Sequence, residues 1–152
     1  MSKAVVFFAE GTEECEALLV VDLLRRAKVD VTVASASGSR EILSSHKIRI
    51  TADALAEEVD YSDVDLVVLP GGIPGTPNLA ANKTVTDTCT AFAKSGKKVA
   101  AICAAPSVLA VDGNITTSYG LGGAIPFALE LVRQLAGQAE ADRIRNAIAY
   151  RH

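Results

Sequence analysis

Residues 3–36 read KAVVFFAEGTEECEALLVVDLLRRAKVDVTVASA, and they contain two short apolar runs around a longer amphipathic segment. The runs at 3–9 and 29–36 are typical of strands, whereas 12–27 repeats its apolar residues every three or four positions, as a helix does. A strand, a helix and a strand in this order predict a right-handed crossover between parallel strands. This stretch therefore indicates an α/β fold built on a parallel sheet.

The rest of the chain continues the same alternation. Strands that are apolar on both faces are typical of parallel sheets covered by helices on each side. We therefore predict a doubly wound, mostly parallel sheet with helices on both faces, a three-layer sandwich. Residues 38–50 differ, because a polar turn separates two short extended pieces, and they predict a small antiparallel excursion. The further strands are expected at 64–72, 97–103 and 114–118, and the further helices at 82–96, 123–137 and 139–150.

Length, charge and composition exclude several classes of protein. The 152 residues fit one domain, and 49% hydrophobic with 22% charged residues is ordinary for a globular chain. A net charge of −3 with scattered Lys and Arg argues against nucleic-acid binding. The apolar run at 4–9 is too short for a membrane span or a secretion signal, so we expect a cytoplasmic protein. No metal-ligand set, phosphate loop or nucleotide fingerprint is present, and we expect no cofactor and no metal.

Glu16 occupies an unusual position on the helix expected at 12–27. At 100° per residue it lies in the middle of the apolar face, whereas Glu14 lies on the other side. Burial would raise the pKa of such a carboxyl and let it share a proton with a neighbour. The alternative is that Glu16 points to the helix N-terminal rim and caps backbone amides.

Cys103 follows the strand at 97–103 and precedes AAPSVLA, which predicts a short helix. A side chain at such a turn lies at the carboxyl end of the sheet, where open α/β folds bind their ligands. Free backbone N–H groups and a helix dipole there would lower the pKa of the thiol. The competing interpretation is an inert core thiol, because free cysteines are among the most buried residues.

The other two cysteines have weaker claims to chemistry. Cys89 lies on an amphipathic helix without a companion acid or base, so we interpret it as a core residue. Cys15 neighbours Glu16 in sequence but lies about 100° around the helix, which makes it a peripheral second thiol at most. Three cysteines without pair or metal spacing, in a chain without a secretion signal, are expected to be free thiols.

Gly71 and Gly72 end the strand expected at 64–72, in the stretch VLPGGIPG. Paired glycines permit close approach of the backbone, and their N–H groups can line an oxyanion site. Any tight turn could use the same residues. The pair gains weight because it lies at the same sheet edge as Cys103 and Glu16.

These pieces together resemble the ThiJ/PfpI superfamily, most closely its branch containing bacterial YajL and the Parkinson-disease-associated deglycase. The resemblance rests on EGTEECEALLVVDLLRRA, VDLVVLPGGIPG, VAAICAAPSVLA and DGNITTSYGLGGAIPFALELVRQLAG, which cover nearly the whole chain. It implies a flavodoxin-like sandwich that is usually dimeric. It also implies that Cys103 is the nucleophile or oxidation site, that Glu16 hydrogen-bonds to it, and that the amides of Gly72 and Ala104 bind an oxyanion.

The chain departs from the family pattern in three places. Relatives usually carry some thirty more residues after the cysteine helix, often with a histidine, so a segment is expected to be missing between about 110 and 112. Eleven residues from Cys103 to Gly113 would nevertheless just allow a parallel crossover. His46 matches a position where relatives often carry arginine, and it is a candidate for a role around the site. Tyr119 and Leu121 replace the usual residues of S-x-G-P-G-T.

Two functions follow as expectations from the resemblance. The first is an enzyme in which Cys103 attacks a small carbonyl compound or a glycated protein or metabolite, with Glu16 moving the proton, as in glyoxalases and deglycases. The second is a redox sensor or chaperone that works through oxidation of Cys103. A cysteine peptidase or amidase is disfavoured, because no histidine is placed to assist the thiol. A homodimer is the expected assembly.

Overall fold

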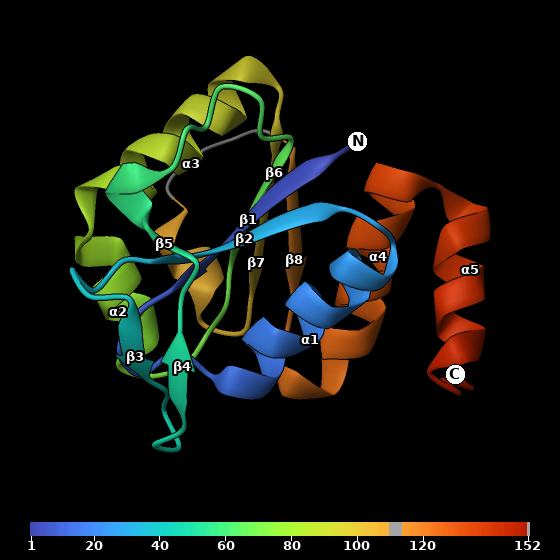
Figure 1. Ribbon diagram of the computed structural model, residues 1–152, viewed down its shortest axis with the longest axis horizontal. Coiled ribbons are helices and arrows are strands. Elements are labelled where there is room, and N and C mark those ends of the chain that lie inside the picture. The colour runs from blue at the N-terminus through green and yellow to red at the C-terminus, as the bar shows by residue number, and fades with distance from the viewer. Residues whose placement is uncertain (110–113, 152) are drawn as a thin grey trace.

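The computed structural model describes residues 1–109 and 114–151 and is built on a six-stranded parallel sheet (Figure 1). The strand order β5-β2-β1-β6-β7-β8 reverses its direction of winding at β1, as in a doubly wound fold. The predicted fold class is confirmed. The strands are β1 (Lys3–Phe8), β2 (Asp30–Ser35), β5 (Ala54–Leu55), β6 (Leu66–Leu69), β7 (Lys98–Ile102) and β8 (Ile115–Ser118).

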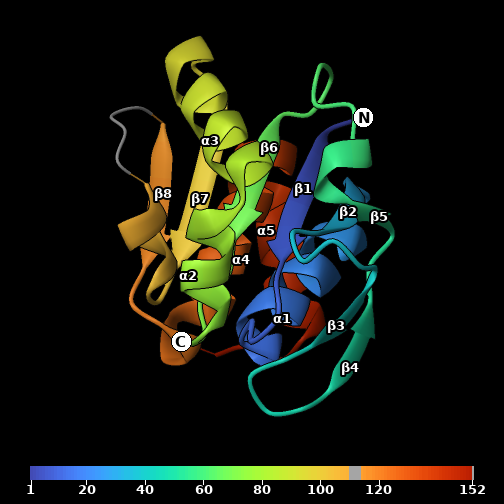
Figure 2. The ribbon, with the colours of Figure 1, turned by 90° about the vertical axis from the view of Figure 1, so that its left-hand side faces the viewer.

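Helices cover both faces of this sheet and make three layers. One face packs against α1 (Glu14–Arg26), α4 (Ala124–Ala136) and α5 (Gln138–Ala147), and the other against α2 (Gly75–Ala81) and α3 (Lys83–Ser95) (Figure 2). Each face has its own apolar cluster, because alternate residues of the central strands point to opposite sides. The central strands β1, β6 and β7 are almost entirely buried, which explains their continuous apolar sequences.

A small antiparallel hairpin stands apart from the sheet. It consists of β3 (Glu41–Leu43) and β4 (Arg49–Thr51), and it confirms the excursion expected at 38–50. The backbone N–H of Ser45 in the connecting loop donates to the carbonyl of Thr12, 2.9 Å away. This contact places the loop beside the start of α1.

The structure differs from the sequence expectation at some element boundaries. β6 ends at Leu69, so Gly71 and Gly72 lie in the loop after the strand, and α2 was not expected. The helix expected after Cys103 is only a 3-10 turn at Ala105–Val108. The segment expected to be missing near 110–112 lies outside the described residues, so that prediction is untested, as is the single-domain assignment.

No helix among the described residues combines the length and the apolar character that crossing a bilayer requires.

Candidate functional site

Cys103 occupies a sharp turn directly after β7. Its φ is +62°, a left-handed conformation that costs energy for a residue with a Cβ. Its backbone N–H donates to the carbonyl of Ser118 at the end of β8, with a donor–acceptor distance of 3.0 Å. Cys103 is exposed, whereas the preceding Ile102 is fully buried. The turn therefore lifts the thiol out of the sheet edge and holds it there.

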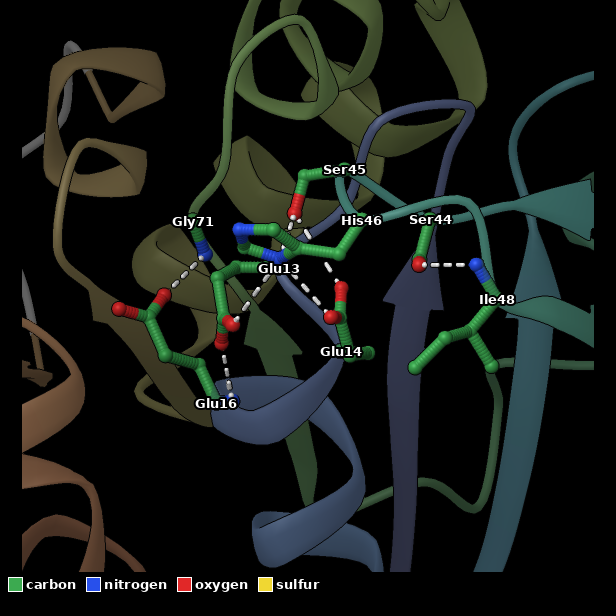
Figure 3. Close-up of polar contacts among 8 residues, drawn as sticks. All are labelled: Glu13, Glu14, Glu16, Ser44, Ser45, His46, Ile48 and Gly71. Atoms are coloured by element: carbon green, nitrogen blue, oxygen red, sulfur yellow. Dashed lines mark hydrogen bonds and ion pairs between the residues drawn. The ribbon is translucent and has the colours of Figure 1, made fainter.

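Glu16 meets this thiol from the other side of the edge. It lies on the first turn of α1 with only 1% of its surface exposed, as its place on the apolar face predicts. One carboxyl oxygen, Oε2, accepts the backbone N–H of Gly71 at 3.1 Å (Figure 3). The carboxyl group also hydrogen-bonds with the Cys103 thiol. The alternative in which Glu16 caps the helix is wrong, because Glu13 occupies that role: its Oε2 accepts the Glu16 N–H at 2.7 Å.

The contact between Glu16 and Cys103 requires a glycine at position 71. A Cβ at position 71 would lie 2.6 Å from the Cβ of Cys103 and 2.7 Å from Oε2 of Glu16. The backbone of the loop after β6 thus fills the space between acid and thiol, and any side chain there would separate them. Gly120, after β8, closes the site from the opposite side: a Cβ there would lie 3.8 Å from the Cys103 sulfur.

Two further backbone amides are directed at the thiol. The N–H groups of Gly72 and Ala104 hydrogen-bond with the Cys103 side chain. These are the two amides that the family resemblance assigns to an oxyanion site. Donors fixed in this way can stabilise negative charge on the sulfur or on an oxygen bound next to it.

The acid and the thiol both have raised pKa values. Burial raises the pKa of Glu16, against the hydrogen bonds from Cys103 and Gly71 that work to lower it. Partial burial of the sulfur, followed by the charge and hydrogen bond of Glu16, raises the pKa of Cys103 more than the Gly72 and Ala104 amides lower it. The expectation of a lowered thiol pKa is therefore wrong, because the four-residue 3-10 turn supplies little dipole and the adjacent acid opposes ionisation. The two groups compete for one negative charge, and a proton can pass between them.

A second acidic group lies on the far side of the same helix turn. Glu14 lies on the other side of the helix from Glu16, as predicted, but it is only 5% exposed, because the loop between β3 and β4 covers it. Oε1 of Glu14 lies 2.8 Å from Nδ1 of His46, and Oε2 accepts the Ser45 hydroxyl at 3.2 Å (Figure 3). Although burial works to raise the pKa of Glu14, its own backbone N–H, the hydroxyls of Ser44 and Ser45, and His46 together lower it.

His46 is connected to the Cys103 site only through acids. Its Nδ1 lies 3.9 Å from Oε1 of Glu13, the acid that caps the backbone of Glu16, and 70% of its side chain is exposed. The ligand atoms of Glu13, Glu14 and His46 lie within 4.8 Å of one another, so this is the group among the described residues that could hold a metal ion. The hydrogen bonds to Glu16, Ser45 and His46 already account for this arrangement.

The other two cysteines, Cys89 and Cys15, lie in surroundings that differ from those of Cys103. Cys89 is buried on α3, and burial raises its pKa to about 12, which leaves it an unreactive thiol. Cys15 is exposed on α1, and its pKa is raised by burial of the sulfur and by the charges of Glu13, Glu14 and Glu16. Of the three thiols, Cys103 is the one with an acid and two amides around it.

Sequence reasoning missed three participants: Glu13, Glu14 and Gly120. The signals were present, because EGTEE places an acid at the helix N-cap and YGLGG places a glycine two residues after the last strand. The sequence predicts the excursion at 38–50, but it does not show that Ser45 and His46, which are 31 and 32 residues further along the chain, fold back onto Glu14 and bury it.

The arrangement of an elbow cysteine, a buried acid and a glycine pair agrees with the match of residues 2–112 to the model of the DJ-1/PfpI family. The chain belongs to the DJ-1/PfpI family. Its curated relatives include Drosophila melanogaster protein dj-1beta, with 32% identity covering 97% of each chain. Arabidopsis thaliana DJ-1 homolog B is 31% identical over 94% of this chain, which spans only 40% of that longer relative.

Two further members of the DJ-1/PfpI family extend the comparison. The solved structure of oxidized Toxoplasma gondii DJ-1 superposes with a TM-score of 0.94 at 28% identity, covering all of both chains. The Caenorhabditis elegans glutathione-independent glyoxalase DJR-1.2 is 26% identical over 94% of this chain and 93% of its own. The fold and the DJ-1-like branch are thereby shown.

The alignments also bear on the short connection after Cys103. The alignment with the Drosophila protein runs over 182 positions, thirty more than this chain has residues. At least that many residues of the relative therefore have no counterpart here.

Proposed function

We propose that this protein is a cysteine-dependent enzyme that converts small reactive carbonyl compounds, as glyoxalases and deglycases do. The observation that carries the proposal is the hydrogen-bonded pair of an exposed thiol, Cys103, and a buried carboxyl, Glu16, with raised pKa. A nucleophile next to a group that can accept and return a proton is the basic requirement of covalent acid–base catalysis. A relative named as a glutathione-independent glyoxalase supports the choice of substrate.

The proposed reaction on a 2-oxoaldehyde needs no external oxidant. The Cys103 sulfur adds to the aldehyde carbon, and the carbonyl oxygen takes up the proton, which gives a hemithioacetal. Glu16 removes the hydrogen from that carbon as a proton and returns a proton to the neighbouring carbon, while the hemithioacetal hydroxyl proton passes to the former ketone oxygen. The first carbon is thereby oxidised to a thioester and the ketone is reduced to an alcohol. Water then hydrolyses the thioester, which releases a 2-hydroxy acid and restores the thiol.

The backbone amides of Gly72 and Ala104 have a defined role in this scheme. Negative charge develops on the carbonyl oxygen when the sulfur attacks and again when water attacks the thioester. Amides already directed at the Cys103 side chain lie beside both of these oxygens and can donate to them without reorganising. A glycated amine or thiol presents the same kind of carbonyl-derived carbon to the thiol, which extends the proposal to deglycation.

The test is the turnover of methylglyoxal by the Glu16→Gln variant. Gln keeps the shape and accepts the Gly71 N–H but cannot shuttle a proton, so we expect turnover to fall by at least about 100-fold. Glu57→Gln, at an exposed position away from the site, is the matched control and should retain full turnover. Unchanged turnover in Glu16→Gln, with a native circular dichroism spectrum, contradicts the proposed role of the acid.

A second candidate function, redox sensing, is favoured by the exposure of Cys103. Hydrogen peroxide can reach the sulfur, and two equivalents would oxidise it to a sulfinate with release of two waters. A protonated Glu16 would then donate a hydrogen bond to a sulfinate oxygen. Peptide mass spectrometry after peroxide treatment separates the two candidates: a Cys103 that stays a thiol while Cys15 is oxidised contradicts sensing.

A further inference from the structure

Three exposed apolar residues lie on the two chain segments that approach Cys103. Ile73, Tyr119 and Leu121 have 70%, 82% and 54% of their surfaces exposed. Single exposed apolar side chains are common on protein surfaces, but several of them on the segments beside a reactive group point to a ligand. The other exposed large apolar residues of the described chain include Met1, Leu18 and Ile48.

The backbone fixes these three residues relative to the thiol. Ile73 directly follows Gly72, whose N–H hydrogen-bonds with the Cys103 side chain. Tyr119 and Leu121 flank Gly120, where a Cβ would lie 3.8 Å from the Cys103 sulfur and 3.9 Å from Oε1 of Glu16. The three residues therefore come from the two segments that contact the reacting atoms.

Tyr119 is also held in place on its own segment. Its ring lies against the glycines that follow: a Cβ at Gly123 would lie 3.0 Å from Cε1 of the ring, and one at Gly122 would lie 3.7 Å from Cε2. A ring that rests on a turn and is 82% exposed offers an apolar face at little cost in conformational entropy. Such a ring offers a fixed apolar surface one residue from Gly120, the glycine that faces the thiol.

We propose that the Cys103 site prefers 2-oxoaldehydes with an aromatic or branched apolar substituent over methylglyoxal, and that Ile73, Tyr119 and Leu121 set this preference. The inference rests on the proposed function and names its substrate class. The sulfur bonds to the aldehyde carbon and the amides bind its oxygen, so the substituent beyond the ketone extends toward the surface, where the segments carrying these three exposed residues lie. Burial of apolar area on these residues stabilises the transition state of the larger substrate.

The test compares kcat/KM for phenylglyoxal and methylglyoxal, written as a ratio. Tyr119→Ser and Leu121→Ser should each lower the ratio at least about fivefold, and the double variant more, because the apolar surface is removed while the thiol and the acid remain. Ile48→Ser, at an exposed apolar residue of the hairpin loop, is the matched control and should leave the ratio unchanged. A ratio that is the same in all variants, or that falls equally in the control, overturns the preference.

A second measurement keeps this inference separate from the proposed function. Alkylation of Cys103 by N-benzylmaleimide and by N-methylmaleimide, followed by peptide mass spectrometry, requires no turnover. The benzyl reagent should lose its advantage in the Tyr119→Ser and Leu121→Ser variants. If neither glyoxal is converted, the proposed function fails and the alkylation ratio alone decides the preference. If the glyoxals are converted but neither ratio responds to the variants, the enzyme stands and the preference fails.

Discussion

Glu14 and Glu16 lie two residues apart on the first turn of α1, are almost equally buried, and yet have pKa values shifted in opposite directions. Glu14 is 5% exposed and its pKa is lowered, whereas Glu16 is 1% exposed and its pKa is raised. The helix places the two side chains about 200° apart. One therefore meets the hairpin loop and the other meets the Cys103 turn.

The difference lies in the donors that each carboxyl group finds. Glu14 has the hydroxyls of Ser44 and Ser45, its own backbone N–H and the His46 ring, which together outweigh its burial. Glu16 has one backbone amide and a thiol, a weak donor that competes with it for the same proton. Burial alone thus does not make a proton-transferring acid; burial with too few donors does.

The largest expected effect comes from separating Glu16 from its thiol. Gly71→Ala would place a methyl group 2.6 Å from Cβ of Cys103 and 2.7 Å from Oε2 of Glu16, so one of them must move. We expect methylglyoxal kcat/KM to fall about 100-fold or more, because small displacements in a catalytic site have effects of this size. Gly122→Ala, whose Cβ meets nothing closer than 3.7 Å, should keep most of the activity. Equal activity in the two variants would contradict the role given to the Glu16–Cys103 contact.

The next effect distinguishes the two acids by the reactivity of the thiol. Glu16→Gln removes a negative charge that raises the pKa of Cys103, so the pH profile of Cys103 alkylation by iodoacetamide should move to lower pH. Glu14 is not among the causes of that shift, and Glu14→Gln should leave the profile in place. The Glu16 variant should therefore alkylate faster at neutral pH although it turns over more slowly. If the alkylation profile moved equally in both variants, Glu16 would not be the acid that specifically controls the thiol.

A smaller effect is expected on stability, with opposite signs. A lowered carboxyl pKa contributes stability above the ordinary value of 4.5, and that stability is lost as the pH falls through the folded-state pKa. Glu14→Gln should therefore destabilise the protein at neutral pH by roughly 1 kcal/mol, with the difference shrinking in acid.

The raised pKa of Glu16 has the opposite effect on stability, so the stability of the wild-type protein falls as the pH rises from 4.5 through that pKa. Glu16→Gln should raise Tm at pH 7 and leave it unchanged below pH 4.5, as thermal unfolding across this range would show.

The smallest effect is expected from His46. Its side chain is 70% exposed, and exposed ion pairs contribute less than about 1 kcal/mol. His46→Ala should change Tm by only a few degrees and should leave methylglyoxal kcat unchanged. A large fall in kcat would show that the hairpin side of α1 acts on the thiol through Glu13. The assignment of the thiol chemistry to Glu16 alone would then be wrong.

The alternation of strands and helices, the parallel sheet and the position of Glu16 were predictable from the sequence, whereas the short elements β5 and α2 were not. Apolar periodicity determines the first three, because the central strands are buried on both faces and the helices on one. The length of the turn after Cys103 and the burial of Glu14 were not predictable. Both depend on contacts with residues distant in sequence, Ser118 for the turn and the Ser45 loop for the acid. The raised pKa of the Cys103 thiol was not predictable for the same reason, since it depends on which acid the fold brings next to the sulfur.

The burial of Cys89 on α3 gives the molecule an internal reporter of its own unfolding. Cys89 is protected by one apolar cluster of the core, whereas Cys15 and Cys103 are exposed in the folded state. Labelling of Cys15 and Cys103 should therefore proceed without unfolding, whereas labelling of Cys89 must wait for an opening of the core that exposes α3. The rate at which Cys89 is labelled in the native protein thus measures the free energy of that opening, with no probe added to the chain.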